Sequence, residues 1–202
     1  MTLLKDFIGR ETLNSNININ VPLFQIGRVD PSLLQSLSYF WLHNQDLAKD
    51  IHQLGLAYPK AMEGASFSDR VLAATGSLVR KKSPYKDYDF TVLLPEMYLL
   101  GKLMSELLAE GIETSRPMLR KLLPKTCLSY HKDMYSEFRL HVVLTTNPDA
   151  KFVIGNLIRD MPTVGGLYLL RTDMYHSAIN MSFAQYRLHA TLSGTINKSL
   201  PL

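Results

Sequence analysis

Two aspartates separated by one residue, Asp87 and Asp89, are the residues whose spacing most directly suggests chemistry. They open the segment DYDFTVLL (87–94), which its apolar residues predict to be a strand. Alternate residues of a strand project to one side, so both carboxylates are expected on one face, with Tyr88 and Phe90 on the other. Mg²⁺ is usually held by one or two carboxylates together with phosphate oxygens and water. The pair therefore predicts a Mg²⁺ site that a nucleotide completes.

A glycine-serine turn precedes these aspartates. Gly76 has no side chain, and Ser77 follows it, so the backbone N–H groups of the turn can approach phosphate closely. Basic residues between the turn and the aspartates, Arg80 and Lys82 among them, are candidates to stabilise the charge of a leaving pyrophosphate. The alternative is that they belong to a solvated loop.

These positions together resemble the nucleotidyltransferase superfamily of polymerase beta, which includes the tRNA CCA-adding enzymes and the minimal nucleotidyltransferases of toxin-antitoxin systems. Gly76, Ser77, Asp87 and Asp89 fill its pattern, and Arg80 takes the place of an arginine in the CCA-adding form. The resemblance implies an α/β or α+β fold with a mixed, largely antiparallel sheet flanked by helices. It also implies Mg²⁺-dependent transfer of a nucleoside monophosphate from an NTP to a hydroxyl, with RNA as one candidate acceptor.

A later strand, predicted for FRLHVVLTT (138–146), is where many members of that superfamily place a third carboxylate. This strand carries Arg139 and His141 instead, and Glu137 precedes it with the same parity. Either Glu137 or His141 is then the candidate base. The displaced acid leaves a second interpretation open, namely a catalytically degenerate fold that serves as a nucleic-acid-binding or assembly subunit.

A weaker resemblance concerns the segments YSEFRLHVVL and LYLLRTDMYHSAINMSFAQYRLH, which are similar to signatures of RelA/SpoT-type pyrophosphokinases. It implies that Arg171, His176 and His189 lie near a phosphate-binding face. The sequence departs from the signature at Leu167, where that family has a metal-binding glutamate. The alternative for Arg171 is an ion pair with a neighbouring aspartate at the surface.

Helices are predicted at three places. Asp30 is a favourable N-cap with proline at the first helical position, and apolar residues at helical spacing continue to about Leu54. A second amphipathic helix is predicted for residues 97–110, ended by Gly111 as a left-handed C-cap. A third is predicted for FVIGNLIRDM (152–161).

The chain is predicted to form one domain. We expect an N-terminal arm (1–29), a nucleotidyltransferase-like core (30–146) and a C-terminal helix-and-strand extension of the same domain (147–202).

Composition sets further limits. The chain has 202 residues, of which 46% are hydrophobic and 20% charged, as in an ordinary globular protein. A formal charge of +4 permits a polyanionic partner, and Arg116, Arg120, Lys121 and Lys125 are spaced to contact an RNA backbone. The single cysteine, Cys127, suits a reducing compartment such as the cytoplasm. No apolar run predicts a membrane span or a secretion signal. The oligomeric state is not readable.

Overall fold

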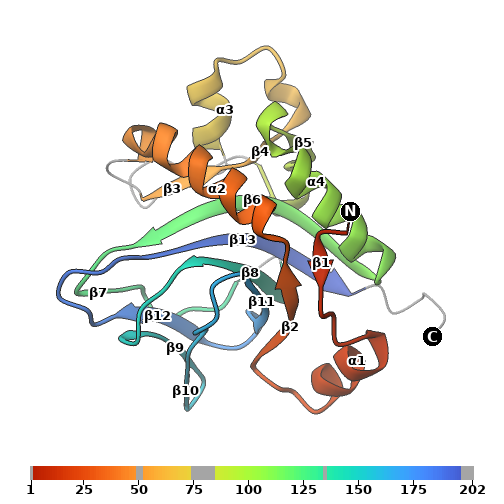
Figure 1. Cartoon of the computed structure of the whole chain (residues 1–202), viewed down its shortest axis with the longest axis vertical. Helices are drawn as coiled ribbons and strands as arrows, with labels where there is room; N and C mark the ends of the chain where they lie inside the picture. Colours follow the sequence, from red (N-terminus) through yellow and green to blue (C-terminus); the bar gives the residue numbers. More distant parts are fainter. Residues whose placement is uncertain (1, 49–51, 74–84, 134–135, 197–202) are drawn as a thin grey trace.

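The computed structural model describes residues 2–48, 52–73, 85–133 and 136–196, and in them two antiparallel sheets face each other (Figure 1). The larger sheet consists, in spatial order, of β1 (Leu4–Lys5), β2 (Leu23–Val29), β11 (Gly166–Arg171), β8 (Phe138–Thr145), β13 (Arg187–Ile196), β6 (Ile112–Leu122) and β3 (Gln53–Gly55). The smaller sheet consists of β10 (Leu157–Arg159), β9 (Ala150–Ile154), β12 (His176–Asn180) and β7 (Thr126–Cys127). A separate pair joins β4 (Ala57–Tyr58) to β5 (Val92–Leu93).

The strands from β6 to β13 form a jelly roll. Along the chain they pass repeatedly between the sheets, so that β8 pairs with β11 and β13 while β12 pairs with β9 and β7. Two facing sheets with these crossed-over neighbours are the architecture of double-sheet jelly rolls, a group that includes the cupins. The expected single mixed sheet flanked by helices is therefore wrong.

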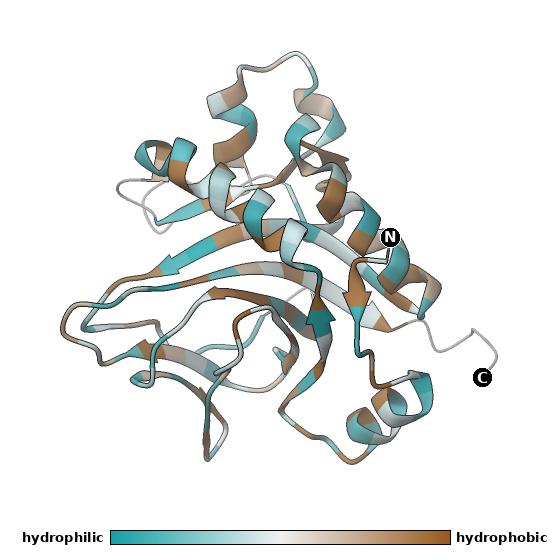
Figure 2. Cartoon of the chain, in the orientation of Figure 1, coloured by the Kyte–Doolittle hydropathy of each residue, from teal (hydrophilic) through white to brown (hydrophobic). Residues whose placement is uncertain are grey.

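Helices cover the outer face of the larger sheet. In Figure 1, α2 (Pro31–Asn44) and α4 (Tyr98–Ala109) lie over this sheet on the side away from the smaller one, with α3 (Phe67–Ala73) above. Hydrophobic and hydrophilic residues alternate along α2 and α4, as expected for helices with one buried face (Figure 2). The apolar core between these helices and the sheet is continuous, and α1 (Arg10–Asn18) packs at its edge through Leu13. No helix in the described ranges is long and apolar enough to cross a membrane.

One helix start and one helix end are predicted from single residues, Asp30 and Gly111. Asp30 accepts a hydrogen bond from the Ser32 N–H at 3.0 Å, which confirms the N-cap of α2. The helix ends at Asn44 and continues as a 3₁₀ turn over Gln45–Ala48, so the extension to Leu54 is wrong. Leu54 lies in β3 and is fully buried. Gly111 has φ of +81°, which confirms it as the left-handed residue after α4.

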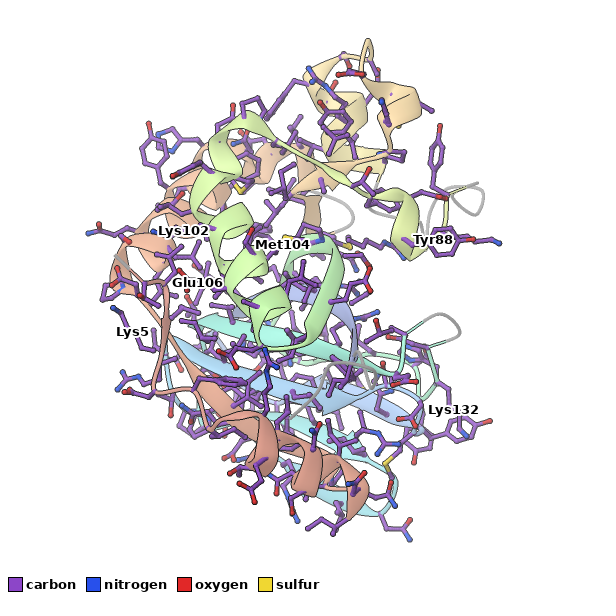
Figure 3. All side chains as sticks on the ribbon, turned by 90° about the vertical axis from the view of Figure 1, so that its right-hand side faces the viewer. Lys5, Tyr88, Lys102, Met104, Glu106 and Lys132 are labelled. Atoms are coloured by element: carbon purple, nitrogen blue, oxygen red, sulfur yellow. The ribbon has the colours of Figure 1, made fainter. Side chains whose placement is uncertain are left out.

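The N-terminal residues are held to α4 by a carboxylate. Glu106 accepts hydrogen bonds from the backbone N–H groups of Leu3 and Leu4, at 2.7 to 3.0 Å (labelled in Figure 3). Residues 1–29 contribute β1 and β2 to the larger sheet. The division of the chain into arm, core and extension stays a prediction.

The strand predicted from FRLHVVLTT is confirmed as β8, and it is buried on both faces. Leu140 and Val142 belong to the core under the helices, whereas Val143 belongs to the second core between the two sheets. His141 faces that second core, with its ring 5.3 Å from the ring of Phe152. A central strand covered on both sides explains the nearly continuous apolar run.

Two other predicted elements are wrong. Residues 152–161 form the β9–β10 hairpin, in which Gly155 has φ of +55°. The segment 87–94 begins with a 3₁₀ turn, Asp87–Asp89, and only Val92–Leu93 is strand. The alternation argument for the two aspartates consequently fails, and Tyr88 is 60% exposed rather than packed.

Candidate metal centre

Two histidines and an aspartate meet beside the smaller sheet, where β12 begins. His131 lies just after β7, and His176 opens β12; the two residues exchange backbone hydrogen bonds of 3.0 and 2.8 Å. The third residue is Asp133, whose backbone N–H donates a hydrogen bond of 2.9 Å to the Thr172 carbonyl and so holds its backbone in place. One side-chain ligand atom from each of the three lies within 4.8 Å of the others. We call His131, Asp133 and His176 the metal triad.

Backbone carbonyls set the tautomers of both imidazoles. His131 Nδ1 lies 2.7 Å from the Ser129 carbonyl, and His176 Nδ1 lies 2.9 Å from the Met174 carbonyl. A carbonyl oxygen only accepts, so each Nδ1 carries the hydrogen and each Nε2 keeps its lone pair. Metal-binding histidines are typically oriented in this way. Burial lowers the pKa of His176, which favours the neutral, ligating form.

The carboxylate of Asp133 is also oriented. Its Oδ1 lies 3.5 Å from His131 Nε2, and its Oδ2 lies 2.5 Å from the guanidinium of Arg139 on β8. One oxygen is thus held by the arginine while the other faces the imidazole. Lys132, between two triad residues, projects outward to solvent (Figure 3).

The donor set determines which ion fits. Two imidazole nitrogens and one carboxylate oxygen are the same donor types as in the 2-His-1-carboxylate triad of non-haem Fe(II) oxygenases. Imidazole suits Fe, Ni, Cu and Zn, whereas Mg²⁺ prefers an all-oxygen shell.

A buried cation lies beside the second core between the two sheets. Arg187, at the start of β13, is 4% exposed, and its guanidinium carbon lies 4.6 Å from the centre of the Phe152 ring. Burial lowers its pKa to about 10. Its Nε and Nη1 atoms have no hydrogen-bond partner among the described residues. An unpaired charge in this position is costly, and a carboxylate ligand matches the guanidinium fork.

Two histidines form a pair beside Arg187. His141 Nδ1 lies 3.2 Å from His189 Nδ1, and both residues are buried. Burial holds the pKa of both imidazoles well below the usual range, and the nearby positive charge of Arg187 adds to the effect. Both rings are therefore neutral near pH 7.

Of the residues predicted for nucleotide binding, the structure describes Arg171 alone. Gly76, Ser77, Arg80 and Lys82 lie outside the described residues. Arg171 forms an ion pair with Asp173 at 2.5 Å, which is the alternative to phosphate binding given above for this residue. The hydrogen bond to Asp173 raises the pKa of Arg171.

The residues predicted for catalysis come from two segments, the turn Asp87–Asp89 and the strand β8 with the residue before it. Asp87 and Asp89 belong to the 3₁₀ turn, where Asp89 accepts from the Lys86 N–H at 2.7 Å. Glu137 is exposed, and its carbonyl accepts from the backbone of Thr172 and Asp173. His141 is buried between the sheets.

Sequence reasoning assigned no role to four residues of this region: His131, Asp133, Arg139 and Arg187. The spacing His131-x-Asp133 was a usable signal for a metal site. Residues two apart in an extended segment project to the same side, which is the argument that was applied to Asp87 and Asp89. His176 was singled out, as was His189, but for phosphate binding.

Comparisons with known proteins agree on the fold. No known protein family matches the sequence, and no curated protein sequence does. AviO1 from Streptomyces viridochromogenes Tue57 has a similar structure, with a TM-score of 0.54 at 10% identity over 90% of this chain and 92% of that one. HygX from Streptomyces hygroscopicus, solved with nickel and 2-oxoglutarate bound, gives a TM-score of 0.53 at 12% identity, covering 95% of this chain and 88% of HygX.

These findings correct the resemblance-based predictions. This chain forms two facing antiparallel sheets and is similar in structure to AviO1 and HygX, so neither the nucleotidyltransferase nor the RelA/SpoT likeness corresponds to the fold. The predicted nucleotidyl transfer, the NTP and RNA partners and the Mg²⁺ cofactor are therefore wrong. The degenerate-nucleotidyltransferase alternative is wrong for the same reason.

Proposed function

We propose that this protein is a mononuclear Fe(II) oxygenase that uses 2-oxoglutarate as co-substrate. The observation that carries the proposal is the metal triad, in which one ring nitrogen of each imidazole and a carboxylate oxygen lie within 4.8 Å of one another. The guanidinium of Arg187, whose Nε and Nη1 atoms have no partner among the described residues, supports the use of 2-oxoglutarate. It is a buried cation and requires an anionic partner. The binding of nickel and 2-oxoglutarate by HygX, a protein of similar fold, agrees with it.

Each residue has a definite task in this proposal. His131, Asp133 and His176 hold the metal, and Arg139 positions Asp133 by its 2.5 Å contact. Arg187 would bind a carboxylate of 2-oxoglutarate through the guanidinium atoms that lack a partner. When bound, Fe(II) and 2-oxoglutarate supply the means to activate O₂ for substrate oxidation, with 2-oxoglutarate converted to succinate and CO₂.

The surrounding protein supports this chemistry. The apolar side chains between the sheets, including Phe152, Tyr168 and Leu170, exclude water from the ligand that Arg187 binds. A reducing, cytoplasmic location, which the single exposed Cys127 suits, favours the ferrous state and is part of the proposal.

Binding and turnover of 2-oxoglutarate test the proposal. With Fe(II) in air, wild-type protein is expected to form succinate from 2-oxoglutarate, and Asp133→Ala and His176→Ala are expected to lose this activity. His43→Ala, which removes an exposed imidazole on α2, is the control and should retain it. Calorimetry with Ni(II) in place of Fe(II) measures 2-oxoglutarate binding without the unknown substrate. Absence of metal-dependent binding in the wild-type protein would refute the proposal.

A further inference from the structure

Three side chains next to the ring of Phe152 carry four buried nitrogen atoms that have no hydrogen-bond partner in the part of the chain that the structure describes. They are Nε and Nη1 of Arg187 and the Nε2 atoms of His141 and His189. The centre of the Phe152 ring lies 5.3 Å from that of His141 and 6.3 Å from that of His189. Buried polar atoms are nearly always paired, so a group of four indicates that a polar ligand enters here.

The contact between the two imidazoles restricts what they can offer to a ligand. His141 Nδ1 and His189 Nδ1 are 3.2 Å apart, so one of them donates a hydrogen and the other accepts it. A neutral imidazole carries one N–H, so the donating ring has a bare Nε2 and the accepting ring has an Nε2–H. The neutral pair thus presents one donor and one acceptor, and a carboxylate can use only the donor.

One added proton removes this restriction. The hydrogen bond between the Nδ1 atoms is kept, and both Nε2 atoms become donors, which suits a carboxylate oxygen. In the absence of ligand, burial and surrounding cations oppose this protonation. The groups that face the pair are Arg187 on β13, Arg139 on β8, Arg120 on β6, and the uncharged Phe152 on β9 and Tyr168 on β11. An entering dianion offsets the repulsion from these arginines.

We propose that His141 and His189 complete the anion pocket that Arg187 begins, and that the pair takes up one proton when a dicarboxylate binds. The choice of 2-oxoglutarate as that dicarboxylate rests on the proposed function. Because the bound state holds more protons than the free state, affinity for 2-oxoglutarate decreases as pH rises. The dependence reaches about tenfold per pH unit for one proton.

Calorimetry measures the number of protons that the protein takes up when it binds the ligand. Zn(II)-loaded wild-type protein is titrated with 2-oxoglutarate at one pH in buffers of different ionisation enthalpy, and the measured enthalpy should vary with the buffer as one proton taken up per ligand. The double variant His141→Gln, His189→Gln should bind Zn(II) as the wild type does, bind 2-oxoglutarate at least tenfold more weakly and lose the proton uptake. Unchanged proton uptake in this variant would assign the proton to the metal site and overturn the inference.

Imidazole ¹⁵N chemical shifts provide a test that needs no variant. Among the six histidines of the Zn(II)-loaded protein, His141 and His189 should give one Nδ1–H and one Nε2–H neutral tautomer, and both should show Nε2–H after 2-oxoglutarate is added. Binding with no change of these tautomers would overturn the inference and leave the proposed function intact. Failure of the metal-loaded wild-type protein to bind 2-oxoglutarate would overturn both.

Discussion

Arg139 and Asp133 form an ion pair of 2.5 Å in which the arginine holds one carboxylate oxygen and leaves the other toward His131. Both side chains are mostly buried, with 12% and 15% of their surfaces exposed. The arginine comes from a central strand of the larger sheet, whereas Asp133 follows an extended segment that runs beside the smaller sheet. The pair therefore connects the metal triad to a central strand of the larger sheet.

Replacement of Arg139 by methionine should weaken metal binding by about 10- to 100-fold, the usual effect of removing a residue that orients a ligand. Arg171→Met is the matched control, because the Arg171–Asp173 pair has the same 2.5 Å separation outside the triad. Ni(II) titration of both variants measures the effect. Equal Ni(II) affinity of the two variants would show that Arg139 does not position Asp133.

Replacement of Arg187 by methionine should separate co-substrate binding from metal binding. We expect 2-oxoglutarate affinity to fall by about 100-fold or more, since a buried charge-assisted contact is lost, while Ni(II) affinity stays unchanged. In ligand-free protein the variant should be as stable as the wild type or more stable by about 1–4 kcal/mol, because an unpaired buried charge is removed. A variant that keeps its 2-oxoglutarate affinity would show that the carboxylate binds elsewhere.

Stability should depend on the buried imidazole pair in acid. The pKa of His141 and that of His189 lie well below 6.5 in the folded protein, so below about pH 6.5 the unfolded chain binds more protons. The free energy of unfolding should decrease as pH falls, by up to about 1.4 kcal/mol per pH unit for each histidine. Urea unfolding of the wild type and the double glutamine variant between pH 5 and 7 checks this. Parallel curves for the two proteins would contradict it.

The close contact between β13 and β8 near the triad should be sensitive to one methyl group. A Cβ at Gly194 would overlap the ring of Phe138, the residue before Arg139. We expect Gly194→Ala to lower the free energy of unfolding by about 1–3 kcal/mol. Gly64→Ala is the control, because nothing lies within 4 Å of its added Cβ. Thermal unfolding of both variants distinguishes them, and equal destabilisation would show that Phe138 moves aside freely.

Local signals in the sequence predicted part of the fold. The Asp30 cap, the glycine after α4 and the apolar run of β8 each depend on neighbouring residues, and the structure confirms all three. The jelly roll depends instead on pairings between distant strands, such as β6 with β13. Several of its strands are too short to show the alternation of apolar and polar residues that identifies a strand, since β7 has two residues and β10 has three.

Only the part of the candidate site whose residues are close in sequence was predictable. His131-x-Asp133 carries the same alternation that was used for Asp87 and Asp89. Its third ligand, His176, is brought there by a backbone bridge between segments distant in sequence. His141 was selected for its titratable ring, but its burial and its pairing with His189 follow from the larger sheet.

The most direct test of the account is a Ni(II) titration of the wild-type protein beside His131→Ala, Asp133→Ala, His176→Ala and the control His43→Ala. We expect one Ni(II) per chain for the wild type and the control, and a loss of at least about 100-fold in affinity for each triad variant. If the triad variants bind Ni(II) as the wild type does, the metal centre is not formed by these residues, and the proposed oxygenase chemistry is wrong.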